Sequence, residues 1–493
     1  MSRTLGLFLL VLLGAALLRI VPLPHEAVWV DELYTRHVLR QSPSEALQVI
    51  RHDLTHPPLY YYVERPFYAL LGDSPYGLRA LSLLCGLLLV AAVARFTLEL
   101  THGETYAALS AATLVAVSDL QVTQAQNARS YALYALEILA IAWAFYRMTR
   151  DPSRSGPKVA YAALGVLAVL THYVASLFLL ALAPAALLST QRRRLVRDWF
   201  LLSLPAALAL LSWGLYVLPV YRAKHGLGQL AWIPKQDWSS LRVMGARLFG
   251  TPLVEHGVRA SILAAVALLG LGAWIWWRRP ACRLPSSPPA MALVMGLAVI
   301  PAAILFAAGW VTRGSFWVDR HLVPSQAFVA IGAGLCLALV ARYRPTLAHL
   351  ALAGLIVLND PLRLIGPPLP RNVPYDKVAA ELRALRAPGE PIVATWAGIP
   401  WPVNYYLADP DSVQLLVIGR NTPATAPAIG GGWAASPYRN FIGGRPRVAL
   451  APKVWLLHQP TDNAVADSLT GQGWRVRSTR RFAGVHLDEL GRP

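Results

Sequence analysis

Long apolar runs recur along most of this chain, and they limit its fold more than any other feature. They return from Leu5 to about Asn359, and a helix of about 20 apolar residues is long enough to cross the hydrocarbon core of a bilayer. Of the 493 residues, 55% are hydrophobic and only 14% are charged. The sequence therefore predicts a polytopic, mainly α-helical membrane protein.

The basic residues predict the topology of these runs. A net charge of +19 would suit a nucleic-acid partner, but the arginines gather in short loops, such as residues 192–194, 278–279 and 342–344. Loops rich in Lys and Arg face the cytoplasm, so we favour a topology signal and expect no nucleic-acid partner. Residues 5–21 follow Arg3, and the spans behind them favour a retained first helix over a cleaved signal peptide.

Placing the basic loops in the cytoplasm predicts eleven spans. They are residues 5–21, 77–99, 104–118, 129–147, 158–172, 174–190, 198–220, 257–277, 290–311, 321–341 and 346–359. Residues 58–71 are apolar but short, and they contain Glu64, Arg65 and Pro66. A span there would break the parity of the count, so we expect a juxtamembrane helix on the outer surface.

A change of composition after Asn359 predicts a second domain. We expect a transmembrane catalytic domain over residues 1–359, with its first outer loop at 22–76, a Pro-rich linker at 360–374 and a soluble extracytoplasmic domain at 375–493. Periodicity within the last part predicts a small α/β fold. Its expected elements are helices at 376–387 and 463–470, strands at 391–397, 413–419 and 454–460, and a mobile loop at 422–444.

Polar residues gather on the predicted outer face of the membrane. An acidic pair at a bilayer is costly if it faces lipid, so Asp31-Glu32, just after the first apolar run, should line a protein cavity. A histidine-diproline turn, 56–58, follows one loop later. Parity places on this face Asp31, Glu32, His56, Asp119, Arg129, His172, Asp319, Arg320 and His321.

These residue types suit glycosyl transfer from a phosphate. One carboxylate can take the proton of an acceptor hydroxyl if burial lifts its pKa, and a phosphate leaving group needs Arg129, His56 or Arg320 nearby. A single displacement with one base inverts the sugar, whereas retention needs a nucleophile and a separate acid/base. The plainer alternatives are a hydrated loop at Asp31, a helix start at His56 and a packed interfacial residue at His172.

A metal site is the weaker interpretation of the histidines. His52 and His56 are spaced like two ligands on one helix, but Pro57 disfavours helix at His56. The three cysteines, Cys85, Cys282 and Cys336, show no ligand spacing. We predict no cofactor and leave a divalent metal as an open alternative.

Several motifs, taken in order, resemble one family of membrane enzymes. They are Asp31-Glu32 with Tyr34, THPPLYYYV at 55–63, GDSPYGLRALSLLCGLL from Gly72, QAQNARSYAL at 124–133, THY at 171–173 and DRHLVPSQAFVAIGAGL from Asp319. Over about the first 340 residues the chain resembles the protein O-mannosyltransferase and lipid A aminoarabinose transferase superfamily. That resemblance implies a GT-C fold, a polyprenyl-phosphate sugar donor and catalysis on the extracytoplasmic face of the plasma (inner) membrane.

The resemblance also implies residue roles. Asp31 would be the acceptor base, Glu32 would help to hold the site, and His56 and Arg320 would lie at the donor phosphate. Arg129 and His321 would join that phosphate site, and the expected substrate-lining residues are Tyr34, Tyr60, Asp119, Gln126, His172 and Tyr173. The chain carries His56 where the aminoarabinose enzymes usually carry lysine, and His321 where tyrosine is more usual in the family. It also lacks the β-trefoil insertion of the eukaryotic protein mannosyltransferases. The acceptor, whether glycan, lipid or protein, does not carry over.

Three other functions stay open at this stage. A lipid A-type modifying transferase would differ only in its acceptor. A transporter or flippase for lipid-linked sugars predicts inverted repeats and charges at the bilayer midplane, whereas here the polar groups gather at one face and Glu137 is the main exception. A chain that has lost catalysis would keep only a binding role, which an intact Asp31 disfavours.

Overall fold

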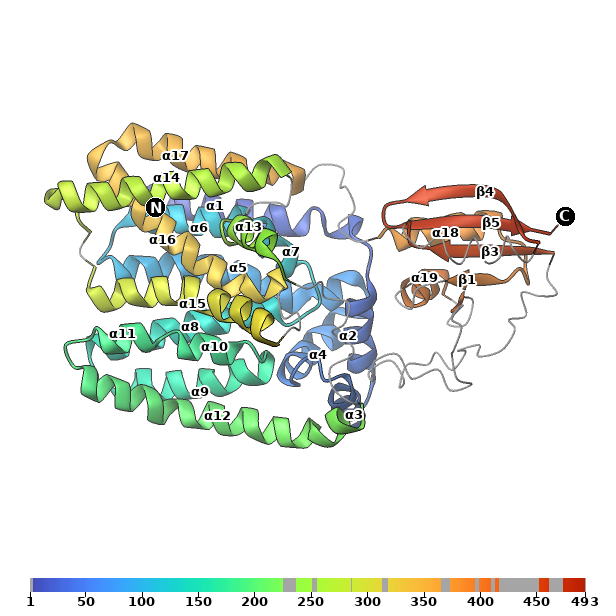
Figure 1. The fold of residues 1–493 in the computed structure, drawn as a ribbon, viewed down its shortest axis with the longest axis horizontal. Helices are drawn as coiled ribbons and strands as arrows, with labels where there is room; N and C mark the ends of the chain where they lie inside the picture. The colour runs from blue at the N-terminus through green and yellow to red at the C-terminus, as the bar shows by residue number, and fades with distance from the viewer. Residues whose placement is uncertain are drawn as a thin grey trace. The chain divides into compact units, whose positions relative to one another are not determined.

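The computed structural model describes ten stretches of the chain, and its contacts divide the chain into two compact units (Figure 1). The described residues are 3–224, 236–250, 255–284, 286–312, 318–364, 373–394, 399–408, 413–415, 452–460 and 473–492. The first unit consists of Met1–Pro22, Thr55–Ala223 and Leu230–Gly366. The second consists of Leu23–Leu54, Lys224–Gln229 and Pro367–Pro493.

The first unit is a bundle of α-helices. In chain order they are α1 (Arg3–Ile20), α4 (Leu59–Leu71), α5 (Pro75–Leu100), α6 (Thr105–Val117), α7 (Asp119–Ala125), α8 (Tyr131–Arg150), α9 (Ser155–Thr171), α10 (Ala175–Leu180), α11 (Ala183–Leu187), α12 (Arg192–Ala223), α13 (Trp238–Leu248), α14 (Glu255–Arg278), α15 (Pro288–Thr312), α16 (Val323–Tyr343) and α17 (Pro345–Leu358). Short 3-10 turns, among them η4 (Asp319–Leu322), join some of them.

The helices confirm a multi-pass membrane protein. In the described part of the chain, seven are long and apolar enough to cross a bilayer, namely α1, α5, α8, α12, α14, α15 and α16. The pair α6 and α7, bent by 61°, would make an eighth crossing, and three apolar segments are shorter, at α9, α10–α11 and α17. These helices and pairs coincide with the eleven predicted spans, although length and composition alone support seven or eight crossings.

Helix burial sorts the bundle into a centre and a periphery. The span that contains α16 is 83% buried, whereas that of α12, which packs beside α9 (Figure 1), is 11% buried. Small residues allow the central helices to approach closely. A Cβ atom at Gly334 of α16 would lie 2.6 Å from the carbonyl oxygen of Ala107 in α6, so a larger residue there would force the two helices apart.

The helix predicted at residues 58–71 is present as α4, and its juxtamembrane position stays a prediction. It packs against α5 and buries Tyr60, Tyr61 and Glu64. Burial raises the pKa of the Glu64 carboxyl to about 9, and within the described residues neither of its oxygens has a hydrogen-bond partner. Because an isolated buried carboxylate is costly, Glu64 is neutral at pH 7 and α4 presents an uncharged face to the bundle.

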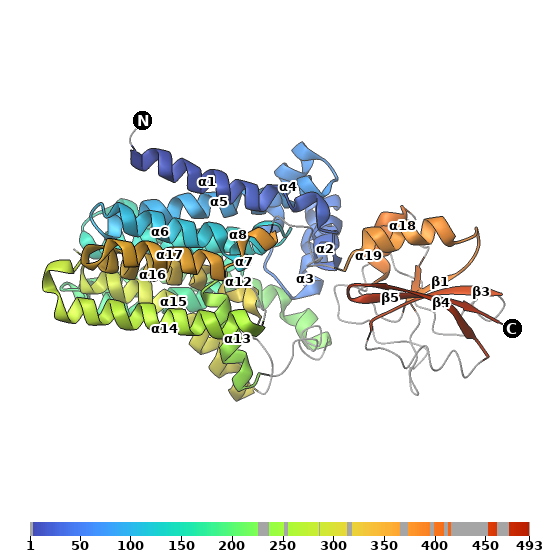
Figure 2. The ribbon, with the colours of Figure 1, turned by 90° about the horizontal axis from the view of Figure 1, so that it is seen from above.

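The second unit contains a five-stranded mixed sheet. Its elements are α18 (Tyr375–Leu385), β1 (Ile392–Ala394), α19 (Pro400–Leu407), β2 (Val413–Leu415), β3 (Lys453–His458), β4 (Arg475–Phe482) and β5 (Val485–Gly491). The strand order is β2-β1-β3-β5-β4. Strand β1 is parallel to β2 and β3, and β5 is antiparallel to β3 and β4. Figure 2 shows α18 and α19 on one face of the sheet, and Trp455 and Leu457 are buried in the core.

The sequence predicted part of this sheet. The helix at 376–387 and the strands at 391–397, 413–419 and 454–460 correspond to α18, β1, β2 and β3, although β1 and β2 have only three described residues each. Helix α19 and the β4–β5 hairpin were not predicted. The expected helix at 463–470 and loop at 422–444 lie outside the described residues.

The segment between α1 and α4 contributes two helices to the second unit. These are α2 (Val30–Arg40) and α3 (Pro43–Asp53). Helix α2 packs against α19: the Val28 amide donates to the Tyr406 hydroxyl at 2.7 Å, and the Arg36 guanidinium lies 5.1 Å from the centre of the Tyr405 ring. The predicted boundaries assigned residues 22–76 to the transmembrane domain, whereas the contacts group Leu23–Leu54 with the C-terminal residues.

Candidate active site

His56 lies in the short loop before α4. Proline is favoured in the first turn of a helix because its missing N–H has no helical acceptor there, and Pro58 is the N-cap of α4. His56 is 4% exposed. A guanidinium nitrogen of Arg129 donates to its Nδ1 atom at 2.9 Å. Because arginine only donates, neutral His56 carries its proton on Nε2, which lies 3.4 Å from the Tyr131 hydroxyl.

Arg129 lies in the connection between α7 and α8. It is 4% exposed, and its second terminal nitrogen is 3.5 Å from the Tyr61 hydroxyl of α4. Its carbonyl oxygen accepts a hydrogen bond from Ser82 of α5 at 3.2 Å. These contacts fix both ends of the residue, so the guanidinium is held beside His56.

Two further histidines complete a row of imidazoles. His172, at the turn between α9 and α10, has its ring centre 5.2 Å from that of His56 and 5.2 Å from that of His321 in η4. The ring stacks on Tyr134 of α8 at 4.8 Å. The Val174 amide donates to its Nδ1 atom at 3.2 Å, which leaves the Nε2 atom to carry the proton of the neutral ring.

Arg320 extends the row at η4. Its guanidinium carbon lies 5.5 Å from the centre of the Tyr131 ring, a cation–π contact. Segments far apart in the sequence thus bring together five basic side chains, which we call the cationic cluster: His56, Arg129, His172, Arg320 and His321.

The electrostatics of the cluster favour an anion. Burial lowers the pKa of His56 well below its ordinary value, and the charges of Arg129, His172, Arg320 and His321 lower it further. Burial also lowers the pKa of His172 well below its ordinary value. The charges of His321, Arg320 and Arg129 lower it further. His56 and His172 are therefore neutral donors at pH 7 beside two permanent guanidinium charges. Such an arrangement suits a phosphate, which accepts charge-assisted hydrogen bonds from arginine.

Asp119, one of the predicted lining residues, forms an ion pair. Its carboxylate lies 2.5 Å from a terminal nitrogen of Arg247 in α13, and the Arg247 Nε atom lies 2.9 Å from Asp319. Arg247 therefore joins α7, α13 and η4, and Asp319 precedes two members of the cationic cluster. In this structure Asp119 is not a member of the cationic cluster. It is linked through Arg247 to η4, the turn that contains Arg320 and His321.

The other predicted lining residues of this unit are tied to the framework. Gln126 donates to the carbonyl oxygens of Leu18 and Arg19 at the end of α1. The Tyr60 hydroxyl is 3.5 Å from Ser82, and the Tyr173 hydroxyl accepts from Trp213 at 2.8 Å. Their part in substrate binding stays a prediction.

The predicted acidic pair lies in the second unit, at the start of α2. The Trp29 amide is 3.4 Å from a carboxylate oxygen of Glu32, which is 1% exposed. Asp31 is half-buried in the first turn of the helix. The Tyr34 hydroxyl donates to the Val49 carbonyl of α3 at 3.4 Å. The Glu32 contact fits a supporting role, and catalysis by Asp31 stays a prediction.

Sequence reasoning missed Tyr131, Tyr134 and Arg247. The two tyrosines stand one helical turn apart on α8, directly after Arg129, so the 3–4 residue spacing could have placed both on the face that carries the cluster. Nothing in the sequence linked Arg247 to Asp119, because 128 residues separate them.

The histidines were also considered as metal ligands. Helix α3 ends at Asp53, so His52 and His56 do not share a helical face. Across the described stretches, no group of three or more His, Cys, Asp or Glu side chains could hold a metal ion.

Comparison with known proteins identifies the fold. Residues 55–216 match the model of a family described as dolichyl-phosphate-mannose-protein mannosyltransferase. No curated protein sequence matches the chain. Among solved structures, ArnT from Cupriavidus metallidurans in the apo state is 15% identical with a TM-score of 0.60, and the match covers 99% of this chain and 98% of ArnT.

Two further structures carry lipid phosphates. ArnT from Cupriavidus metallidurans bound to undecaprenyl phosphate is 16% identical, with a TM-score of 0.60 and coverage of 99% of this chain and 98% of that one. The archaeal oligosaccharyltransferase AglB from Archaeoglobus fulgidus, in complex with an inhibitory peptide and a dolichol-phosphate, is 12% identical, with a TM-score of 0.52 and coverage of 92% and 69%.

These comparisons confirm the predicted fold class. The chain has the GT-C fold of membrane glycosyltransferases, with a small C-terminal sheet. It resembles the protein O-mannosyltransferase family over residues 55–216 and ArnT over nearly its whole length.

Proposed function

We propose that this chain is a membrane glycosyltransferase that moves a sugar from a polyprenyl-phosphate donor to an acceptor hydroxyl or phosphate. The observation that carries the proposal is the cationic cluster, which offers two guanidinium groups and three imidazoles to one anion. The undecaprenyl phosphate and dolichol-phosphate of ArnT and AglB are ligands of the chemistry that such a cluster would bind.

The proposed reaction is a single displacement with inversion. The acceptor oxygen attacks the anomeric carbon as the bond from that carbon to the phosphate oxygen breaks. Arg129 and Arg320 stabilise the charge that develops on the departing polyprenyl phosphate, so the leaving group needs no proton. Asp31, on this proposal, takes the proton of a hydroxyl acceptor as general base, and Glu32 holds the helix turn that carries it. A glycan, a lipid or a protein could supply the acceptor.

The proposed site faces the extracytoplasmic side of the plasma (inner) membrane. Three helices support this orientation, because each has the cationic cluster at one end and exposed basic residues at the other. Helix α8 runs from Tyr131 to Arg150, α9 follows Arg154 and ends beside His172, and α16 runs from η4 to Arg342. Since clusters of Lys and Arg in short loops stay in the cytoplasm, the cationic cluster lies on the opposite face.

A transfer assay with Asp31 and Glu32 variants tests the proposal. The purified chain in nanodiscs should release polyprenyl phosphate from a synthetic short-chain polyprenyl-phosphate sugar as the sugar reaches an acceptor from cell-envelope extract. Asp31→Asn keeps the shape but cannot accept a proton, so turnover should fall about a hundredfold or more, while donor affinity changes far less. Glu32→Gln should lose less turnover.

Each outcome of this assay decides a different part of the proposal. Near-normal turnover in Asp31→Asn would remove Asp31 as the base, and a larger defect in Glu32→Gln would move that role one residue along. A wild-type chain that binds no lipid-linked sugar would contradict the glycosyltransferase proposal itself. Mass spectrometry of envelope glycans with and without the gene then identifies the acceptor.

A further inference from the structure

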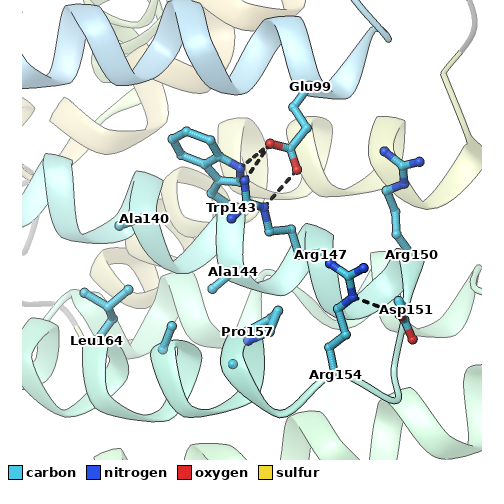
Figure 3. Close-up of a pocket in the computed structure, with 12 residues that line it drawn as sticks. Glu99, Ala140, Trp143, Ala144, Arg147, Arg150, Asp151, Arg154, Pro157 and Leu164 are labelled. Atoms are coloured by element: carbon cyan, nitrogen blue, oxygen red, sulfur yellow. Dashed lines mark hydrogen bonds and ion pairs between the residues drawn. The ribbon is translucent and has the colours of Figure 1, made fainter.

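A second polar site lies at the other end of α8, in a pocket between α8 and the start of α9 (Figure 3). The pocket has a volume of about 800 Å³. Helix α8 has 20 residues from Tyr131 to Arg150, a length of about 30 Å at 1.5 Å per residue. That length matches the hydrocarbon thickness of a bilayer, so the pocket and the cationic cluster lie near opposite membrane faces.

One end of the pocket is basic. Arg147, Arg150 and Arg154 gather there (Figure 3). Glu99 of α5 accepts two hydrogen bonds from Arg147, both at 2.9 Å, and Asp151 pairs with Arg154 at 3.1 Å. Arg150 is exposed, and in the described residues no carboxylate forms an ion pair with it. Three guanidinium groups against two carboxylates leave a net positive charge in the pocket.

The start of α9 adds to this charge. The helix begins at Ser155, and the residue before it, Arg154, makes no side-chain cap. The first amides of a helix have no helical acceptor, and the helix dipole makes this end positive. Gly156 in that first turn lines the pocket, and its lack of a side chain leaves the backbone accessible. The basic end therefore offers backbone donors as well as arginines to an anion.

The other end of the pocket is apolar. Ala140 of α8 and Leu164 of α9 lie at the end away from Arg150 and Arg154 (Figure 3), and Ala144 and Ala160 also line the pocket. Trp143 lies beside them, and its indole nitrogen donates to Glu99 at 3.0 Å. Tryptophan is enriched at the depth where lipid headgroups meet the hydrocarbon core. The apolar end thus continues from the headgroup level toward the bilayer interior.

We propose that this pocket binds an anionic phospholipid, with the phosphate of the headgroup on Arg150 and Arg154 and the start of an acyl chain against Leu164. The basic end alone would also accept free phosphate, but only a lipid uses the apolar wall that continues from it. Basic pockets between transmembrane helices on the cytoplasmic side are suited to anionic headgroups. The site is separate from the cationic cluster and does not depend on the activity proposed for it.

Native mass spectrometry of the full-length chain in detergent tests this assignment. The protein is titrated with dioleoyl-phosphatidylglycerol, with zwitterionic dioleoyl-phosphatidylcholine and with inorganic phosphate. We expect phosphatidylglycerol to bind most tightly. The double variant Arg150→Gln with Arg154→Gln should lower the affinity for phosphatidylglycerol about tenfold or more, because each basic side chain near a membrane surface attracts anionic lipid. Leu164→Gln should weaken the binding of phosphatidylglycerol, and it should leave the weaker binding of inorganic phosphate unchanged.

The matched control is Arg193→Gln with Arg194→Gln. These two exposed arginines lie in the first turn of α12, outside the pocket, so the control removes the same charge and should keep phosphatidylglycerol affinity. An equal loss in the control pair would mean that lipid binds through general surface charge, which overturns the proposal. Two other results would overturn the proposal, because they would show that the pocket binds only an anion. One is inorganic phosphate that binds as tightly as the lipid, and the other is wild-type lipid affinity in Leu164→Gln.

Discussion

The two arginines of the cationic cluster are held in different ways. Arg129 donates to His56 and contacts Tyr61, whereas Arg320 lies over the face of Tyr131. A planar guanidinium can stack on a ring and still present parallel N–H groups to a phosphate, which the compact ammonium of lysine cannot do. The exact residue type therefore matters at both positions.

Substitution of Arg320 tests this difference. Arg320→Ala should weaken the affinity for a lipid-phosphate donor by about tenfold or more, because charge-assisted hydrogen bonds are worth about 1.5 to 3 kcal/mol. Arg320→Lys should lose less, since the charge remains while the two-pronged geometry is lost. Titration of a short-chain polyprenyl-phosphate sugar gives both affinities. Wild-type affinity in both variants would remove Arg320 from the site.

His56 predicts a pH dependence of donor binding. Its pKa is lowered well below the usual value by burial and then by Arg129, so the ring is neutral at pH 7 in the empty site. A bound phosphate supplies negative charge and gives Arg129 another acceptor, which frees the His56 Nδ1 atom and raises the pKa of the ring. Binding then takes up a proton, and donor affinity should rise as the pH falls from 7.5 toward 5.5.

A phosphodiester donor is the appropriate probe for this dependence, because its single charge does not change over that pH range. His56→Asn should flatten the rise, since the amide cannot be protonated there. An affinity that is constant or falls toward pH 5.5 in the wild-type chain, or an equal rise in His56→Asn, would contradict the account of His56.

At the scale of elements, one arginine holds three of them together at the edge of the site. Arg247 of α13 pairs with Asp119 at the start of α7 and with Asp319 at η4, and its side chain is 15% exposed. Removal of one partner from a largely buried ion pair leaves the others uncompensated. The network therefore ties the position of η4, and with it Arg320 and His321, to the packing of α13.

Arg247→Ala should lower the thermal midpoint by several degrees and weaken donor binding with it. A loss of about 3 kcal/mol is expected when a buried pair is broken. One kcal/mol shifts the Tm by roughly 2 to 4 °C in domains of about 150 to 250 residues and by less in a larger unit such as this bundle. The control is Arg242→Ala, an exposed arginine on the same helix. Equal melting of the two variants would show that the network does not stabilise the bundle.

The elements that the sequence predicted well are those with a strong local signal. Each apolar run from α1 to α17 became a helix, because a bilayer leaves the backbone few other ways to satisfy its hydrogen bonds. His56, Arg129, His172 and Arg320 were expected on one face from parity and motif, and the structure brings them together.

Features that depend on distant partners could not be predicted. The ion pairs of Arg247 join residues far apart in the chain. Helix α19 has only eight residues and contains Pro400 and Pro402, and proline is a poor helix former, so no local pattern predicted a helix there. The grouping of α2 with α19 depends on contacts such as that of Val28 with Tyr406, which no local pattern shows.

At the scale of the whole molecule, the bundle has two chemically different ends. Members of the cationic cluster lie just before the first residues of α8 and α16, and Arg150 and Arg342 lie in the last turns of these helices. The second unit joins Leu23–Leu54 to the C-terminal sheet. On the proposed topology, both parts of that unit must therefore lie outside the cytoplasm.

Cysteine labelling in intact cells tests this topology. Ser44→Cys in α3 and Arg475→Cys in β4 replace exposed residues of the second unit, and both should react with a membrane-impermeant maleimide. Arg193→Cys at the start of α12 is the opposite-face control and should react only after the cells are permeabilised. If the cysteine at position 44 or 475 does not react with the maleimide in intact cells, the proposed orientation is contradicted.

The central claim is that the cationic cluster holds the donor phosphate, and a structure of the full-length chain with undecaprenyl phosphate tests it most directly. The account predicts phosphate oxygens about 2.7 to 2.9 Å from guanidinium nitrogens of Arg129 and Arg320, with an imidazole of His56 or His172 as a further donor. A bound phosphate that touches neither arginine would contradict it.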